Sequence, residues 1–292
     1  MAAPPQGMAA PPPDAAPGPE PATRSEESIA LEGYYARVQA GLLDRGLLRT
    51  DSGGTDAPFT DTDLARNFRQ IAFFEEYSSV GGQLVQKETE SLLHRWEGPV
   101  RMEVTFGRAV DLETRARDGQ AIAEYADRLA RVTGHPIRQV SSGGNFHVFV
   151  LYEDERREIG PELRRIIPRL DDTAVATVEN LPRSSYCLVF AWDPQNDGVY
   201  TKAVAVIRAE HPDLFRLSCI HEELAQGLGL ANDSPFARPS IFNDDEEFGL
   251  LTTHDEMLLK MLFDKRLRPG MSADEARPII DQMAAELAGG TS

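Results

Sequence analysis

The sequence predicts an α+β fold, because helical and strand-like patterns of apolar residues follow one another along the chain. Hydrophobic residues make up 41% of the 292 residues, which is enough for an ordinary buried core. Apolar residues recur first with the period of a helix and later alternate with the period of a strand. A predicted hairpin leads directly into a further helix. We therefore expect a twisted mixed sheet backed by helices.

Before the hairpin, two predicted helices are followed by a strand, a helix, a strand and a helix. The first helix carries Ile29, Leu31 and Tyr34 at helical spacing, and the second begins at a Thr60 or Asp61 cap. Pro161 suits the first turn of a later short helix. The apolar patterns predict helices over residues 25–48, 60–76, 120–132 and 160–170, and strands over residues 99–106 and 146–152.

Two apolar runs with a turn between them predict the hairpin. Residues 186–192 and 202–207 are rich in branched and aromatic side chains, and residues 193–198 read Asp-Pro-Gln-Asn-Asp-Gly, a turn by composition. There is no internal repeat, and no change of composition divides the globular part. The expected organisation is a Pro/Ala-rich segment at residues 1–24, a helical region packed on the domain at residues 25–98, and the α+β domain at residues 99–292.

The charge balance excludes some classes of partner. With 30 Lys and Arg against 47 Asp and Glu, the net charge is −17. Nucleic acids and anionic membrane surfaces need clustered basic residues that the chain does not show. No apolar run has the length needed to span a bilayer. As written, the chain also has no signal peptide.

The first residues leave the location open. The tract from Met1 to Pro21 is rich in Pro and Ala and cannot form a packed core. It suits a disordered cytoplasmic tail, but it equally suits a tether behind a cleaved signal or lipid anchor if Met1 is a misplaced start. Cys187 and Cys219 are the two cysteines. They fit one disulfide in an oxidising compartment, or two buried thiols in the cytosol.

The stretch from Cys219 to Asp233 carries the strongest chemical signal. It resembles the active-site helix of metzincin zinc proteases, whose H-E-x-x-H-x-x-G-x-x-H motif binds zinc through three His and activates water with the Glu. Glu223 takes the place of that catalytic Glu, and Gly229 that of the Gly that ends the helix. The metal positions of this frame are occupied by Glu222, Gln226 and Asn232.

Two later segments extend the resemblance. Ser240-Ile241-Phe242 stands where metzincins have the Met-turn below the metal, with Phe242 in place of Met. Residues 251–263 resemble the last helix of matrix-type metzincins, in which Asp255 would pin the chain or support the site helix. The Glu-Glu-Leu, Asn-Asp-Ser and Ser-Ile-Phe-Asn-Asp runs also resemble a bacterial family of unknown function, DUF 2927. The resemblance implies a zincin-like fold with a small C-terminal helical part.

The residues at the metal positions make zinc a poor fit. Glu222, Gln226 and Asn232 offer one carboxylate and two amides, whereas zinc prefers imidazole and thiolate. Ca²⁺, Mg²⁺ or Mn²⁺ suit oxygen ligands better and would need another carboxylate, which Asp233, Asp244 or Asp245 could supply. A metal-free hydrogen-bonded network is the other alternative. His221 has no His one turn later, so a helix-start or surface role suits it better than zinc binding.

Two classes of function follow. The first is a non-catalytic descendant of a peptidase that binds an extended peptide or protein segment by strand addition, without a cofactor. The second is a peptidase-like hydrolase in which Glu223 acts as general base with an atypical divalent metal at Glu222, Gln226 and Asn232. Likeness of fold does not decide between them.

Overall fold

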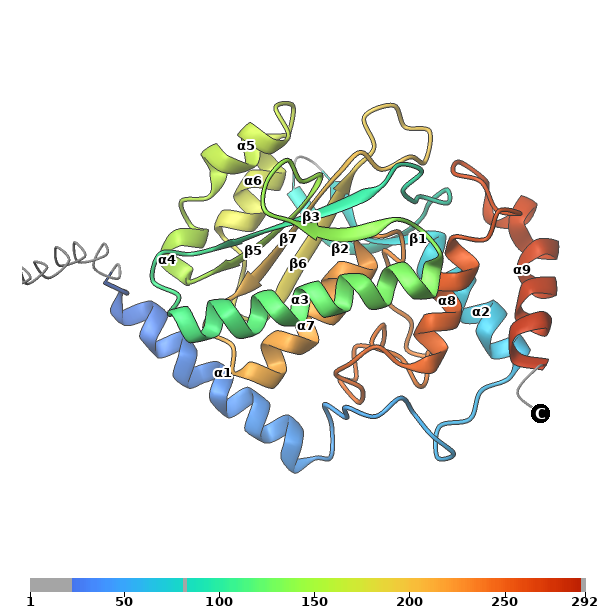
Figure 1. The fold of residues 1–292 in the computed structure, drawn as a ribbon, viewed down its shortest axis with the longest axis horizontal. Coiled ribbons are helices and arrows are strands. Elements are labelled where there is room, and N and C mark those ends of the chain that lie inside the picture. Colours follow the sequence, from blue (N-terminus) through green and yellow to red (C-terminus); the bar gives the residue numbers. More distant parts are fainter. Residues whose placement is uncertain (1–22, 81–82, 290–292) are drawn as a thin grey trace, which may run out of the picture.

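A five-stranded mixed sheet lies at the centre of the computed structural model, which describes residues 23–80 and 83–289 (Figure 1). The Pro/Ala-rich segment expected at residues 1–24 lies almost wholly outside the described residues. The helices are α1 (Glu26–Asp44), α2 (Asp61–Ala72), α3 (Leu112–Thr133), α4 (Glu153–Arg156), α5 (Gly160–Ile166), α6 (Asp172–Glu179), α7 (Asp213–Gln226), α8 (Thr253–Leu262) and α9 (Ala273–Ala288).

The strand order in the central sheet is β4-β3-β5-β7-β6. The strands β4, β3, β5 and β7 run parallel, and β6 runs antiparallel to β7 at one edge. This confirms the predicted mixed sheet and the predicted hairpin. The bounds of these strands are β3 (Val100–Phe106), β4 (Ile137–Val140), β5 (Phe146–Leu151), β6 (Cys187–Trp192) and β7 (Lys202–Arg208).

Helices cover both faces of the sheet, as Figure 1 shows. Alternate side chains of a strand point to opposite faces, so the central strands β5 and β7 contribute to two cores. On one face Val148 and Ala205 pack with residues of α3, α7 and α8 in the larger core. On the other face Phe149 and Val206 pack with residues of α5 and α6 in a second core. The central strands β5 and β7 are therefore buried on both sides, as their almost uninterrupted apolar sequence suggests.

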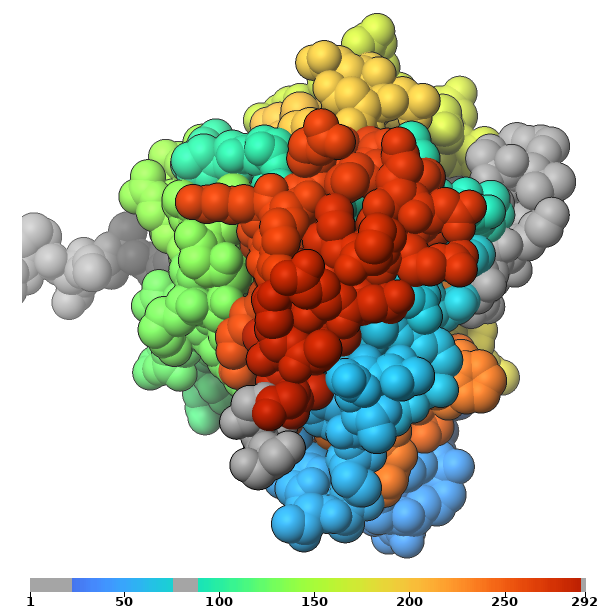
Figure 2. Space-filling view, turned by 90° about the vertical axis from the view of Figure 1, so that its right-hand side faces the viewer, coloured from blue at the N-terminus to red at the C-terminus, as the bar shows by residue number. Residues whose placement is uncertain are grey.

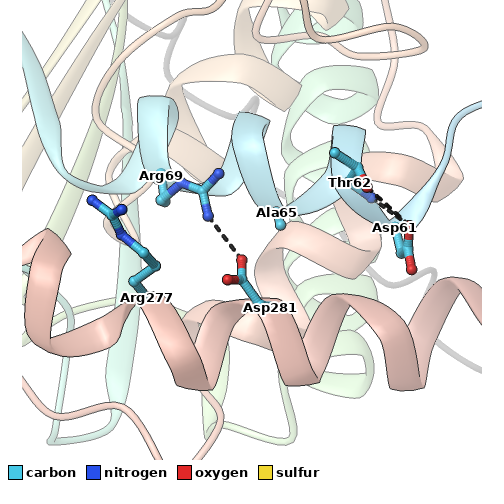
Figure 3. Close-up of a pocket in the computed structure, with 6 residues that line it drawn as sticks. All are labelled: Asp61, Thr62, Ala65, Arg69, Arg277 and Asp281. Atoms are coloured by element: carbon cyan, nitrogen blue, oxygen red, sulfur yellow. Dashed lines mark hydrogen bonds and ion pairs between the residues drawn. The ribbon is translucent and has the colours of Figure 1, made fainter.

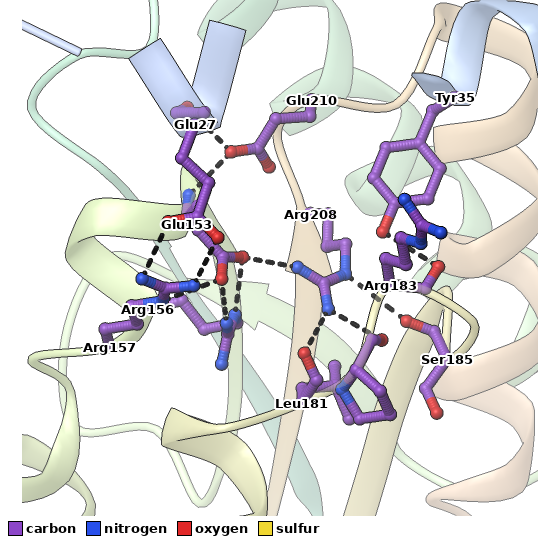
Figure 4. A network of polar contacts seen from close by, with 12 residues as sticks. Glu27, Tyr35, Glu153, Arg156, Arg157, Leu181, Arg183, Ser185, Arg208 and Glu210 are labelled. Atoms are coloured by element: carbon purple, nitrogen blue, oxygen red, sulfur yellow. Dashed lines mark hydrogen bonds and ion pairs between the residues drawn. The ribbon is translucent and has the colours of Figure 1, made fainter. Parts of the chain in front are cut away.

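A buried polar network fastens α1 to the end of the sheet (Figure 4). The Ser28 hydroxyl of α1 donates to the Glu210 carboxylate over 2.8 Å, and burial raises the pKa of that carboxyl group. Next to it, Glu153 accepts from the guanidinium groups of Arg156 and Arg208, each over 2.6 Å. Because buried charges are stable only when they are paired, this network holds α1 in one position.

The region between α2 and the sheet corrects one prediction. Residues 25–98 were expected to be helical, but β1 (Phe74–Val80) and β2 (Gln83–Glu90) form an antiparallel pair of their own after α2. Gly81-Gly82 between them is a hairpin signal in the sequence. Within the described residues, none of the helices combines the length and the apolar character needed to cross a membrane.

Candidate functional site

The motif helix α7 lies beneath the sheet against β6 and β7. It carries Glu222, Glu223 and Gln226, as the sequence predicted. The helix ends at Gln226, before Gly229, where the sequence predicted its end. Gly229 follows outside the helix with a φ of 132°. A Cβ atom there would lie 2.2 Å from the His94 carbonyl oxygen. Only glycine tolerates both the positive φ and this close approach, so Gly229 directs the chain out of the helix.

A disulfide joins β6 to α7. Cys187, the first residue of β6, is bonded to Cys219 of the helix, with the two Cα atoms 5.9 Å apart. Of the two alternatives that the sequence left open, the structure has the disulfide. Cys219 and Glu222 are three residues apart on one helix and share a face. The disulfide therefore brings Cys187 beside the carboxylates, a neighbour that the sequence analysis did not assign to the site.

Cys187, Glu222 and Glu223 form a compact group. One side-chain atom of each lies within 4.8 Å of the others, and the Cys187 Sγ is 4.0 Å from a Glu222 carboxylate oxygen. Glu222 is half-buried, and Glu223 is only 4% exposed. Metals bind the thiolate form of cysteine, and a disulfide sulfur has no thiolate to offer. The oxidised group thus presents two carboxylates, whose oxygens suit hard cations or hydrogen-bond donors.

The side chains of Gln226 and Asn232, the other two proposed ligands, contact different partners. The Gln226 amide donates to the Asp233 carboxylate over 3.3 Å. The Asn232 amide donates over 3.0 Å to the carbonyl of Gln70 at the end of α2, and the Asn232 backbone N–H donates to Ile71. Asp233 is therefore the residue after Gly229 that meets Gln226, while Asn232 fastens the chain to α2.

His221 lies in the core rather than on the surface. Its ring stacks on Tyr125, with centroids 4.0 Å apart, and its Nδ1 accepts the backbone N–H of Leu251 over 3.1 Å. Burial lowers its pKa to about 3. The imidazole is therefore neutral at ordinary pH, and one of its nitrogens is already used in holding the residues before α8. This arrangement gives His221 a packing role.

The segment that resembles a Met-turn is fastened to α8. The Asp255 carboxylate accepts from the Ser240 hydroxyl and from the Ile241 and Thr252 backbone N–H groups. Together with Thr252 it forms a capping box at the start of the helix. Phe242 is fully buried in the larger core. Asp255 and Phe242 thus hold the turn in place.

A separate hollow of about 540 Å³ lies between α2 and α9, the cyan and dark red segments side by side in Figure 2. An ion pair between Arg69 and Asp281 bridges the two helices over 2.9 Å (Figure 3). Its lining contains no residue of the motif helix, since it consists of Asp61, Thr62, Ala65, Arg69, Arg277 and Asp281. The hollow is a surface groove between two packed helices.

The fold and the site together define the class of this protein. It is a mixed α/β domain in which α7, the helix that carries Glu222 and Glu223, lies beneath the antiparallel edge strand β6, and a disulfide joins the helix to the strand. Residues 61–282 match the family described as "Protein of unknown function (DUF2927)". The chain belongs to this family. No curated protein and no solved structure matches the chain.

Proposed function

We propose that this domain is zincin-like and that it binds an extended peptide or protein segment by strand addition along β6, without catalysis. The observation that carries the proposal is the outer edge of β6. This strand pairs with β7 on one side and with no other strand in the part of the chain that the structure describes. An unpaired edge of this kind can accept a further strand through its backbone hydrogen bonds.

The hydrogen bonds of β7 show which backbone groups of β6 point toward β7 and which point outward. The Ala203 N–H donates to the Asn145 carbonyl over 3.0 Å on the β5 side. In a strand, the backbone groups of successive residues point to opposite sides. Lys202 and Val204 therefore direct their N–H and C=O groups toward β6.

The outward groups of β6 can then be named. Val204 is opposite Phe190, so the backbone groups of Phe190 face inward. Trp192 faces inward too, because its carbonyl accepts the N–H of Thr201 over 2.9 Å. The odd-numbered residues of β6 therefore present N–H and C=O to an incoming strand; they are Cys187, Val189 and Ala191.

The order of elements supports a zincin-like arrangement. The hairpin feeds the motif helix, Gly229 turns the chain out of it, and the Ser240-to-Phe242 turn follows with Asp255 as its support. In the metzincins, which the sequence resembles, the corresponding helix carries the metal ligands below the sheet. Here the same position carries Glu222 and Gln226.

The donor set argues against a zinc enzyme. Glu222, Gln226 and Asn232 supply no imidazole or thiolate, and the nearby Cys187 sulfur belongs to a disulfide. The amides of Gln226 and Asn232 already donate to Asp233 and to the carbonyl of Gln70. These contacts favour a polar network without a cofactor.

A second candidate is a peptidase-like hydrolase, which the closeness of Glu222 and Glu223 favours. Two adjacent carboxylates attract a hard divalent cation. In this candidate Glu222, Gln226 and Asn232 would be its ligands, and the two amides would have to leave their present partners. Such an ion would lower the pKa of water at the site. Glu223 would then act as general base on that water.

A selection from a library of random extended peptides tests the binding proposal. We expect that Ala191→Pro, which removes an outward N–H donor, weakens a selected peptide at least about tenfold, while Ala191→Val binds it normally. Equal binding by both variants, with their melting temperatures unchanged, would refute strand addition at this edge. Mass spectrometry of the bound peptides tests the second candidate, which requires cleavage that Glu223→Gln abolishes.

A further inference from the structure

We propose that the pocket between the end of α5 and the β6–β7 hairpin binds a small aromatic anion, a compound with one ring and one carboxylate. The pocket has a volume of about 270 Å³. It is lined by Ile166, Ile167, Pro168, Arg169, Trp192, Pro194, Thr201 and Lys202. It is separate from the carboxylates of α7, because the residues that line it come from neither α7 nor the turn after it, and it adjoins the proposed peptide edge only through Trp192 of β6.

The wall of this pocket is apolar and built on rigid elements. Ile166 and Ile167 are buried at the end of α5 and belong to the second core. Trp192 packs against the same core from β6. The Thr201 hydroxyl donates to the Trp192 carbonyl over 3.2 Å, so it does not compete for a ligand. An indole beside two branched side chains offers a flat apolar surface, on which an aromatic ring stacks well.

Two cations border this apolar surface. Lys202 lies opposite Trp192 in the strand register, and Arg169 follows α5. Within the described residues neither side chain makes an ion pair or a side-chain hydrogen bond, although the chain is strongly acidic. The carboxylate of Asp193 is bound instead by the backbone N–H groups of Gln195 and Gly198. The two cations therefore remain available to an anion from solution.

The size and charge of the pocket define the ligand class. Pockets for small molecules usually measure about 300–1,000 Å³, so this one admits a single ring with a short side chain. The apolar wall selects the ring, and the cations select a carboxylate at its end. A ligand of this size binds weakly, with a dissociation constant of about 1 mM.

Titration of the protein with 3-phenylpropionate tests the proposal. The chain has two tryptophans, and Trp96 is only 1% exposed, so a saturable change in fluorescence reports on Trp192. We expect Arg169→Gln and Lys202→Gln each to raise the dissociation constant about threefold to tenfold. The matched control Lys260→Gln removes one exposed positive charge from α8 and should leave binding unchanged. The neutral 3-phenylpropanamide should bind about tenfold more weakly than the acid.

The location of the ligand is tested by Trp192→Phe. This variant should abolish the fluorescence change while ligand-observed NMR still detects 3-phenylpropionate. The proposal is overturned if no saturable response occurs, or if the amide binds as well as the acid. It is also overturned if Lys260→Gln weakens binding as much as the two pocket variants do. Circular dichroism of each variant confirms that a loss of binding is not a loss of folding.

Discussion

At the scale of single residues, the chemistry of α7 is decided by the direction each side chain takes from the helix. Glu222 and Glu223 lie at the disulfide, and Gln226 lies against Asp233. His221, which directly precedes Glu222 in sequence, instead stacks on Tyr125 in the core. Neighbours in sequence on one helix thus have separate roles, because successive residues point about a quarter turn apart.

The buried imidazole of His221 makes stability depend on pH. The pKa is 6.5 in the unfolded chain and about 3 in the folded protein, so the unfolded state binds a proton first as the pH falls. His221 therefore lowers the free energy of unfolding progressively from about pH 6.5 to about pH 3, by up to about 4 kcal/mol. Above pH 6.5 it has no such effect.

Replacing His221 by Gln tests this linkage, because Gln can accept the Leu251 N–H but does not titrate. The variant should be less stable than the parent at about pH 7, since the ring stacking is lost. The difference in the free energy of unfolding between parent and variant should be smaller by about 3 kcal/mol at about pH 4.5. Urea unfolding of both proteins at the two pH values measures this difference. An equal difference at the two values would show that His221 does not titrate as described.

At the scale of elements, the sequence predicted the segments whose apolar pattern is strong. The hairpin of β6 and β7 and the helix that follows it were predicted, because branched side chains alternate and then recur at helical spacing. The β1–β2 pair was not predicted, because its mostly polar residues show no clear alternation of apolar and polar side chains. Gly81-Gly82 is the hairpin signal in this part of the sequence. The attachment of Asn232 to α2 depends on a long-range contact that no local pattern encodes.

The disulfide between β6 and α7 should contribute strongly to stability. The two cysteines are 32 residues apart, so the bond restricts a loop whose closure entropy corresponds to about 4 kcal/mol. We expect reduction to lower the free energy of unfolding by about this amount, as measured by urea unfolding with and without a dithiol. Thiol counting in the unfolded, unreduced protein should find no free thiol. Two titratable thiols would contradict the bond.

The turn that ends at Phe242 should depend on Asp255. Removing this buried carboxylate leaves the Ser240 hydroxyl and the Ile241 N–H without their acceptor. Asp255→Ala should cost about 3 kcal/mol or more, and lower the melting temperature by roughly 6–12 °C. Asp274→Ala, in the exposed first turn of α9, is the matched control and should cost less than about 1 kcal/mol. A similar loss of stability in both variants would show that Asp255 does not hold the turn.

At the scale of the whole molecule, the proposed function requires stability without a metal. A ligand that binds only the folded state raises the melting temperature by mass action. A strong chelator should therefore leave the melting temperature unchanged, within about 1 °C. Differential scanning calorimetry with and without chelator measures this. A clear decrease that Zn²⁺, Mn²⁺ or Ca²⁺ restores would instead support the hydrolase, with Glu222, Gln226 and Asn232 as ligands.

Amide hydrogen exchange along β6, measured by NMR with and without a selected peptide, tests strand addition most directly. The inward N–H groups of Phe190 and Trp192 already face β7 and should exchange slowly in both states. The outward N–H groups of Cys187, Val189 and Ala191 should exchange fast in the free protein and at least about tenfold more slowly in the complex. Unchanged exchange at these three positions, with the peptide bound, would place the peptide elsewhere and contradict the proposed binding mode.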